Sequence, residues 1–200
     1  DNMPRPLRKH IEDATYHIFT RCINSSDLIR NDAYKEILLK ILQATQEKYA
    51  FDLVFYQILD NHIHLVIRTR KGEASISRII QYFKARFAEQ FNRKNNRTGP
   101  FWNERFGDVI VDLQENPVFY LLWLLWYLAY NAVRKNKVRD PRKYQYGSIS
   151  QYLDQDSCNN GKVRITHHQF FINLGDSFTE RVMRFLLIED MYRKRLGLPV

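Results

Sequence analysis

The sequence predicts an α+β fold in which helices pack on an antiparallel sheet, and three observations support this prediction. Short segments rich in β-branched and aromatic residues alternate with longer segments of helical periodicity. Two strand-like segments are separated by only two residues, which suits antiparallel pairing. Hydrophobic residues make up 44% of the 200 residues, which is enough for one core in a single domain.

The first two elements are a strand and a helix. Residues 14–23 are rich in β-branched and aromatic types that alternate in part, and the polar residues 24–26 then end the strand. Asn31 can cap a helix in which apolar residues recur every three or four positions as far as Tyr49. This spacing predicts a surface helix that packs one apolar stripe on the sheet.

A hairpin and a second helix follow. Residues 51–59 and 62–67 are short apolar runs, and the turn-forming pair Asp60-Asn61 between them predicts a tight hairpin. Ser75 or Ser77 can then begin a helix with apolar residues at helical spacing, which ends before a polar loop at 95–100.

Residues 105–113 are predicted to form a further strand, and Asn116-Pro117 then marks the start of a helix. Residues 116–133 carry no charge over eighteen positions, close to the minimum length of a membrane span. They contain three tyrosines, a basic run follows them, and no second apolar segment accompanies them. We therefore expect a buried helix and no contact with a membrane.

The chain is predicted to divide near residues 140–160, where polar residues interrupt the periodicity. Residues 1–153 are expected to form the main domain, and residues 154–200 a helical extension packed on it. The last helix begins at Ser177, because Ser177 and Glu180 have the spacing of a capping box.

Charge and cysteine content indicate the class of partner and the compartment. Thirty-one Lys and Arg residues against 22 Asp and Glu give a net charge of +9 and a pI near 9.6, which favours a polyanion such as nucleic acid. Cys22 and Cys158 are too few for a disulfide framework and have no zinc-site spacing. With no secretory signal in view, we expect a cytoplasmic location.

His62 and His64 are the strongest candidate metal ligands. They lie two apart on a predicted strand, so both side chains leave the same face, while the apolar residues between and after them form a core face. The alternative is that both are polar residues on a solvent-facing strand. A site for Mg²⁺ or Mn²⁺ would also need an oxygen ligand from elsewhere in the fold.

Tyr127 and Asn131 could complete such a site. They lie four apart on one face of the predicted helix, so the phenol and the amide oxygen could reach the same point. A tyrosine can attack phosphorus, because a phosphotyrosine bond retains the energy needed to rejoin strands. The alternative is an aromatic core helix. His167 and His168 are expected at the surface, because no carboxylate lies at ligand spacing from them.

Four motifs resemble those of a known family over residues 14–153. In this region the chain is similar to the REP-associated tyrosine transposases, within the single-tyrosine HUH (IS200-like) transposases that act on single-stranded DNA. Asp60 and Ala132 stand where that family often has proline. The motifs are TYHIFTRC at 15–22, NHIHLVI at 61–67, FN at 91–92 ahead of GPFWNERF at 99–106, and YLAYNAVR at 127–134 followed by an aromatic-serine segment at 144–148.

The resemblance implies a ferredoxin-like antiparallel sheet that carries the two histidines. It also implies a divalent metal ion, Mg²⁺ or Mn²⁺, held by His62 and His64 with Asn131 as the third ligand. Tyr127 would be the nucleophile, with Tyr130 in reserve, and would form a 5′-phosphotyrosine link to single-stranded DNA beside a palindromic hairpin.

Basic residues are expected to contact the DNA backbone. The aromatic residues Phe101, Trp102 and Tyr144 could stack on unpaired bases or belong to the core. The basic candidates are Lys84, Arg86, Arg93, Arg97, Arg105, Arg134, Lys135, Lys137 and Arg139.

Other readings stay open at this point. A degenerate member could bind hairpin DNA or RNA without cutting it, and a hydrolase of small phosphate esters would need only the histidine pair. A homodimer could complete each site with the partner's tyrosine helix, and the sequence does not choose between this arrangement and a monomer.

Overall fold

The long helices begin at side chains that accept a hydrogen bond from the first turn. The computed structural model describes residues 11–154 and 163–197. The capping residues are Asn31, Ser75, Asn116 and Ser177, which confirms the predicted helix starts and settles the second one on Ser75. In chain order the elements are β1 (Thr15–Arg21), α1 (Asp32–Lys48), β2 (Phe51–Ile58), β3 (His62–Thr69), α2 (Ile76–Lys94), β4 (Gly107–Ile110), α3 (Pro117–Arg134), α4 (Gln169–Ile172) and α5 (Phe178–Arg195).

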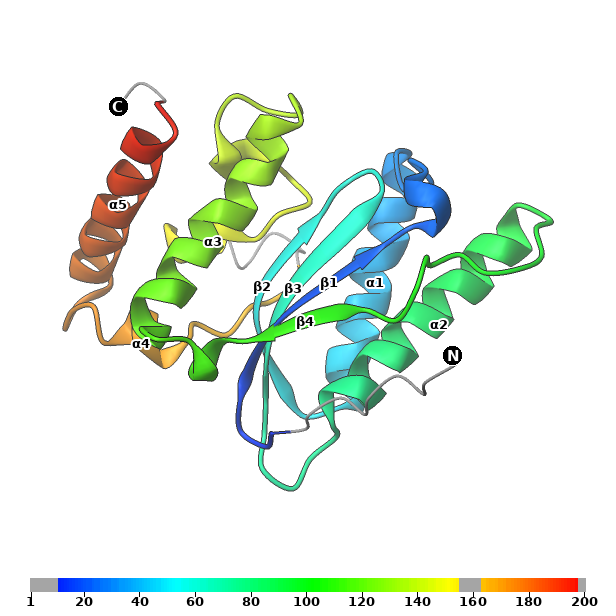
Figure 1. The fold of residues 1–200 in the computed structure, drawn as a ribbon, viewed down its shortest axis with the longest axis horizontal. Helices are drawn as coiled ribbons and strands as arrows, with labels where there is room; N and C mark the ends of the chain where they lie inside the picture. Colours follow the sequence, from blue (N-terminus) through cyan, green and yellow to red (C-terminus); the bar gives the residue numbers. More distant parts are fainter. Residues whose placement is uncertain (1–10, 155–162, 198–200) are drawn as a thin grey trace, which may run out of the picture.

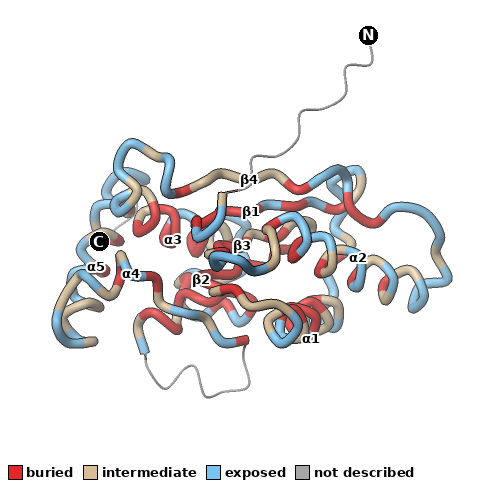
Figure 2. The backbone as a smooth tube through the Cα atoms, turned by 90° about the horizontal axis from the view of Figure 1, so that it is seen from below, coloured by how far each residue is buried: buried red, intermediate tan, exposed pale blue. Residues whose placement is uncertain are grey.

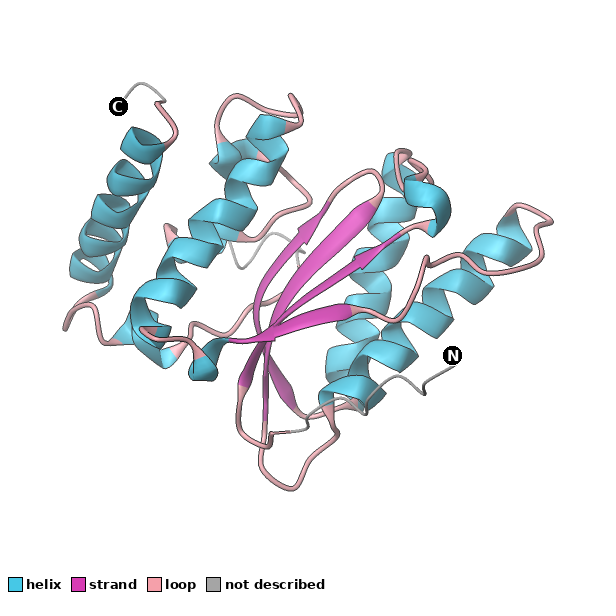
Figure 3. Cartoon of the chain, viewed as in Figure 1, coloured by secondary structure: helices cyan, strands magenta, loops and turns pink. Residues whose placement is uncertain are grey.

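The four strands form one antiparallel sheet in the order β2-β3-β1-β4 (Figure 3). Together with α1 and α2 they follow the ferredoxin-like order β-α-β-β-α-β. This arrangement confirms the predicted fold class and the hairpin between β2 and β3. The hairpin turn closes with a backbone hydrogen bond from Leu59 to the carbonyl of His62.

The sheet separates two apolar cores. Helices α1 and α2 cover one face, and α3 with α4 and α5 lies against the other (Figure 1). Strand alternation decides which residues enter each core: Ile63 and Leu65 of β3 face α1 and α2, whereas Val66 belongs to the core beneath α3. A bulge between Leu53 and Phe55 of β2 changes this alternation locally. Buried positions follow the strands and the helix sides that face them (Figure 2).

Helix α3 is the buried helix that was expected over residues 116–133. Leu121, Leu125 and Trp126 are fully buried between the sheet and α5. The Trp126 indole donates a hydrogen bond to the backbone oxygen of Phe185 in α5. Of the helices that the structure describes, none is long and apolar enough to span a bilayer.

The segment before α3 differs from its prediction. Strand β4 covers only Gly107–Ile110, and a short 3-10 turn (Val111–Leu113) replaces the rest of the strand predicted at 105–113. The strand ends because the Val111 side chain turns into the core and the Asp112 carboxylate accepts a hydrogen bond from the amide of Thr15 at 2.6 Å.

Two predictions of surface exposure are wrong. His168 is buried, where its Nδ1 accepts a hydrogen bond from the first turn of α4 and its Nε2 lies 3.0 Å from the Thr15 hydroxyl. His167 is half-buried and packs its ring against Tyr152. Both rings help to seat the C-terminal segment on the sheet. Cys22 is buried, and Cys158 lies outside the described residues.

The aromatic residues considered for base stacking belong to the core. Phe101 is 1% exposed, Trp102 8% and Tyr144 7%. Phe101 and Trp102 pack edge to face with each other and contact Phe87 of α2. The Tyr144 hydroxyl donates a hydrogen bond to the carbonyl oxygen of Ile58. The core alternative is therefore the correct one for these three residues.

Candidate functional site

One cavity of about 590 Å³ contains the predicted metal ligands and the predicted nucleophile. His62 and His64 reach it from β3, and Tyr127 and Asn131 from α3. These four residues share a cavity because α3 covers the sheet face on which both histidines lie. A single chain supplies all four.

The two imidazoles are held by neighbouring side chains. His62 Nδ1 lies 2.6 Å from Asn61 Oδ1. An amide oxygen can only accept a hydrogen bond, so His62 carries its proton on Nδ1 and keeps a lone pair on Nε2. His64 Nδ1 lies 3.1 Å from Nε2 of His17 in β1. Such outer contacts orient metal-binding histidines in known metal sites.

Burial keeps both imidazoles neutral at physiological pH. The pKa of His62 is lowered to about 4, mainly by desolvation and also by the charges of Arg21 and Lys135. Desolvation also holds the pKa of His64 well below its ordinary value, with the neighbouring histidines adding to the effect. Neutral imidazole is the form that binds a cation.

His17 is a site residue that the sequence analysis missed. Its pKa is lowered to about 4 by burial, and its ring stacks on that of His64 with centroids 5.3 Å apart. His17 and His64 meet because β1 and β3 are neighbours, with Phe19 opposite His64 in the register. Alternation along β1 could have placed His17 on this face, but only the register pairs it with His64.

The two tyrosines considered as nucleophiles have different environments. Tyr127 is 43% exposed and lines the cavity. Tyr130 is 4% exposed, and its hydroxyl donates a hydrogen bond to Glu189 of α5 at 2.7 Å. Burial raises the pKa of Tyr130, and Glu189 raises it further. Tyr127 is therefore the better candidate, and Tyr130 anchors α3 to α5.

Arg134 holds the cavity side of α3 in place. It donates hydrogen bonds from Nη2 to the Tyr127 carbonyl oxygen at 3.0 Å and to Asn131 Oδ1 at 2.8 Å. Its guanidinium lies 4.6 Å from the centre of the Tyr127 ring, and Nη1 donates to the Tyr192 hydroxyl of α5. Helix α3 continues past Ala132 to Arg134, because alanine keeps the backbone amide that proline would lack.

The donor set fits a divalent ion that accepts nitrogen and oxygen ligands. It combines the two imidazoles with the Asn131 amide, whose oxygen keeps a second lone pair beside its bond to Arg134. The Asn131 Nδ2 atom is buried and has no partner. Within residues 11–154 and 163–197, no group of three or more His, Cys, Asp or Glu side chains could hold a metal.

The basic residues predicted to contact DNA fall into two groups. Arg105 and Lys135 line the cavity, together with Arg21, which the sequence analysis did not select. The other residues lie outside its lining, and several have protein partners. Lys84 donates to the carbonyl of Glu104, Arg86 pairs with Glu89, Arg97 binds Asn92 and the carbonyl of Pro100, and Lys137 pairs with Asp60. Arg139 lines a separate recess beside Tyr130. Arg93 is exposed at the end of α2.

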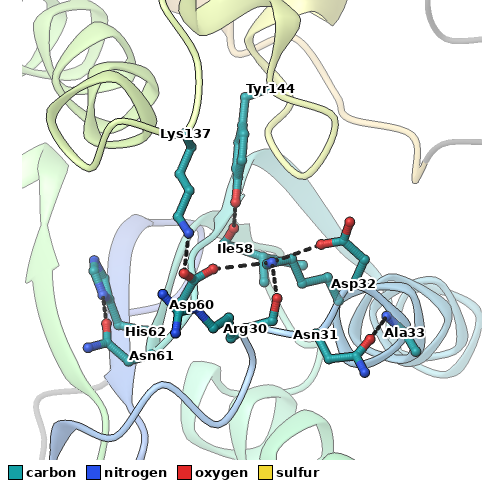
Figure 4. A network of polar contacts seen from close by, with 11 residues as sticks. Arg30, Asn31, Asp32, Ala33, Ile58, Asp60, Asn61, His62, Lys137 and Tyr144 are labelled. Carbon is teal, nitrogen blue, oxygen red and sulfur yellow. Dashed lines mark hydrogen bonds and ion pairs between the residues drawn. The ribbon is translucent and has the colours of Figure 1, made fainter.

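Asp60 organises the turn that precedes His62 (Figure 4). One carboxylate oxygen lies 3.2 Å from Lys35 of α1, and the other accepts a hydrogen bond from Lys137, which follows α3. Lys35 is also bound by Asp32 and by the carbonyl of Arg30, each at 3.0 Å. The network connects the histidine strand to α1 and to the end of the tyrosine helix.

Comparisons with known proteins identify a family and a related fold. The family model described as "Transposase IS200 like" matches residues 10–118, more than half of the chain. A Haemophilus influenzae protein provisionally named a REP-associated tyrosine transposase is 26% identical over 148 residues, which cover 70% of this chain and 75% of that protein. A solved structure described as a REP-associated tyrosine transposase bound to a REP hairpin superposes with a TM-score of 0.60. It is 15% identical and matches 74% of this chain and 84% of that one, so the two share a fold.

Proposed function

The chain belongs to the IS200-like transposases, and from this membership we propose a metal-dependent single-stranded DNA transposase and endonuclease that forms a 5′-phosphotyrosine intermediate at hairpin DNA. The observation that carries the proposal is the shared cavity: Tyr127 opens into the same space as His62 and His64.

The proposed reaction is a transesterification. The Tyr127 Oη atom gives up its proton to solvent and attacks a backbone phosphorus, the bond from phosphorus to the 3′ oxygen breaks, and that oxygen takes up one proton from solvent to leave as a 3′-hydroxyl, so no net proton is gained or lost. The 5′ end of the strand stays attached to the tyrosine. Attack by another 3′-hydroxyl reverses the step and joins two strands, so the reaction conserves the phosphodiester energy.

The residues around the tyrosine have separate tasks in this scheme. His62 and His64, with Asn131, would hold Mg²⁺ or Mn²⁺, which when bound polarises the phosphate and stabilises the leaving oxygen. Arg134 holds the Tyr127 carbonyl and the Asn131 amide in one geometry. Such orientation matters because small displacements of reacting groups are costly in rate.

Hairpin DNA is the proposed partner. Support comes from the related fold solved with a REP hairpin and from the net charge of +9. Arg21, Arg105 and Lys135 line the cavity and can neutralise backbone phosphates beside the scissile bond.

The test is formation of a covalent protein–DNA adduct. A labelled hairpin oligonucleotide with single-stranded flanks is incubated with the protein and Mn²⁺, and adducts are detected on a denaturing gel. We expect an adduct with the wild type and with Tyr120→Phe, which changes a tyrosine of α3 outside the cavity lining. Tyr127→Phe should form none.

Two outcomes would contradict the proposal. An adduct that persists in Tyr127→Phe would remove Tyr127 from the role of nucleophile. Binding of the hairpin by the wild type without any adduct would favour the non-cleaving hairpin-binding protein instead.

A further inference from the structure

Phe19 is an exposed aromatic residue in the wall of the cavity. It lies on β1, is 41% exposed, and lines the cavity together with Tyr127. Leaving much of a phenylalanine in water forgoes the free energy of burying it, so an exposed ring inside a polar cavity is a candidate contact for a ligand.

The ring is supported by a glycine on the neighbouring strand. Gly107 of β4 pairs with Phe19, and a Cβ atom placed on Gly107 would lie 2.1 Å from Phe19 Cε2 and 2.2 Å from Cζ. The Phe19 ring therefore lies directly over the Gly107 backbone, in space that any other residue would fill. The His17 ring, with its centroid 5.6 Å away, adjoins it along β1.

We propose that Phe19 is a stacking platform for one unpaired base of the DNA strand that enters the cavity. This inference rests on the proposed function and adds a base-binding position to it. Single-stranded DNA sites combine cations that follow the backbone with aromatic faces that receive bases. Arg21, Arg105 and Lys135 supply the cations in this cavity, and Phe19 supplies an exposed ring without a hydrogen-bonding group.

A purely structural role for Phe19 makes a different prediction. An aromatic ring packed across a strand glycine can stabilise a sheet by itself. Removing such a ring would lower stability and would leave DNA affinity unchanged in the folded protein. A stacking role instead predicts a loss of affinity that depends on the presence of one particular base.

The experiment measures DNA binding in the Tyr127→Phe background with Mn²⁺, so that no strand is cut. The probes are a fluorescent hairpin oligonucleotide with a single-stranded flank and a series in which each flanking nucleotide in turn lacks its base. The variants are Phe19→Leu, which keeps an apolar group over Gly107 but has no aromatic face, and Phe19→Trp. Phe119→Leu is the matched control, because Phe119 is 42% exposed on α3 but does not line the cavity.

We expect Phe19→Leu to weaken binding by about tenfold, within the range found when a stacking aromatic is removed. Phe19→Trp and Phe119→Leu should bind within about twofold of their parent, a difference too small to indicate a lost contact. At one flanking position, removal of the base should weaken the parent by a similar factor and leave Phe19→Leu unchanged, because both changes remove the same contact.

Two results would overturn the inference. Phe19→Leu could bind DNA as tightly as its parent. Alternatively, every missing base could weaken DNA binding by the same factor in Phe19→Leu as in the parent, which would mean that no base shares a contact with Phe19. Either result is distinct from failure of the proposed function, which is measured separately as the absence of a covalent adduct between the wild-type protein and the hairpin oligonucleotide. Urea unfolding of each variant confirms that the protein compared is folded.

Discussion

Replacing Asp60 with alanine should destabilise the protein, because it removes the shared acceptor of two cations. The Lys35 and Asp60 side chains are 5% and 11% exposed, so their ion pair is almost completely buried. Removing one partner of a buried ion pair costs about 3–5 kcal/mol, mainly because the other charge remains buried. The Asp60 carboxylate should therefore contribute much more to the free energy of unfolding than a carboxylate in an exposed ion pair does.

The expected magnitude for Asp60→Ala is smaller than this range. Lys35 keeps the Asp32 carboxylate and the Arg30 carbonyl, each at 3.0 Å, so its charge is not left without partners. Lys137 is 31% exposed and can be solvated by water, so the loss of its ion pair with Asp60 should cost about 1 kcal/mol or less of stability. We expect a loss of about 2–3 kcal/mol, which corresponds to a fall in Tm of about 4–12 °C.

The assay is equilibrium unfolding in urea followed by tryptophan fluorescence. Glu89→Ala is the matched control, because Glu89 and its partner Arg86 are 57% and 50% exposed. That variant should lose less than about 0.5 kcal/mol. Adding Lys35→Met to Asp60→Ala should recover part of the loss, since the second change removes the charge that the first left buried.

The dependence on pH follows from the pKa of Asp60. Burial raises this pKa, but hydrogen bonds and charge from Lys137 and Lys35 outweigh burial and hold it below its ordinary value. A carboxyl with a depressed pKa in the folded state stabilises the protein above its unfolded pKa of about 3.9. The difference between wild type and Asp60→Ala should therefore shrink as the pH falls below about 4. A loss from Asp60→Ala no larger than that from Glu89→Ala would refute this reasoning.

Two further predictions concern the cavity. His62→Ala should abolish the stimulation of DNA cleavage by Mn²⁺, because it removes one of the two imidazoles; cleavage with unchanged metal dependence would reject the histidine pair as ligands. Arg134→Gln should leave the salt dependence of hairpin binding almost unchanged, because the Arg134 donors are occupied within the protein. Lys135→Gln, in contrast, should reduce the slope of log Kd against log salt by about one. Equal reductions in the two variants would show that Arg134 contacts phosphate, as the sequence alone suggested.

The positions of the elements could be predicted from the sequence because they follow from local patterns. Apolar periodicity, capping residues and the Asp60-Asn61 turn lie within a few positions of one another, and they placed the helices and the β2–β3 hairpin. Strand β4 was predicted too long, because its end depends on a contact between Asp112 and the distant Thr15. Burial of His168 was missed for the same reason, since its partner lies on β1.

The candidate site depends partly on local sequence patterns and partly on tertiary packing. The sequence by itself determined that His62 and His64 share one strand face and that Tyr127 and Asn131 share one helix face, because the strand and helix periods decide this locally. Only the tertiary structure decided that α3 covers the histidine face, that His17 meets His64, and that Phe19 lines the cavity while Phe101 and Trp102 are buried in the core. Those facts depend on strand order, register and packing between residues far apart in the chain, and no local pattern encodes them.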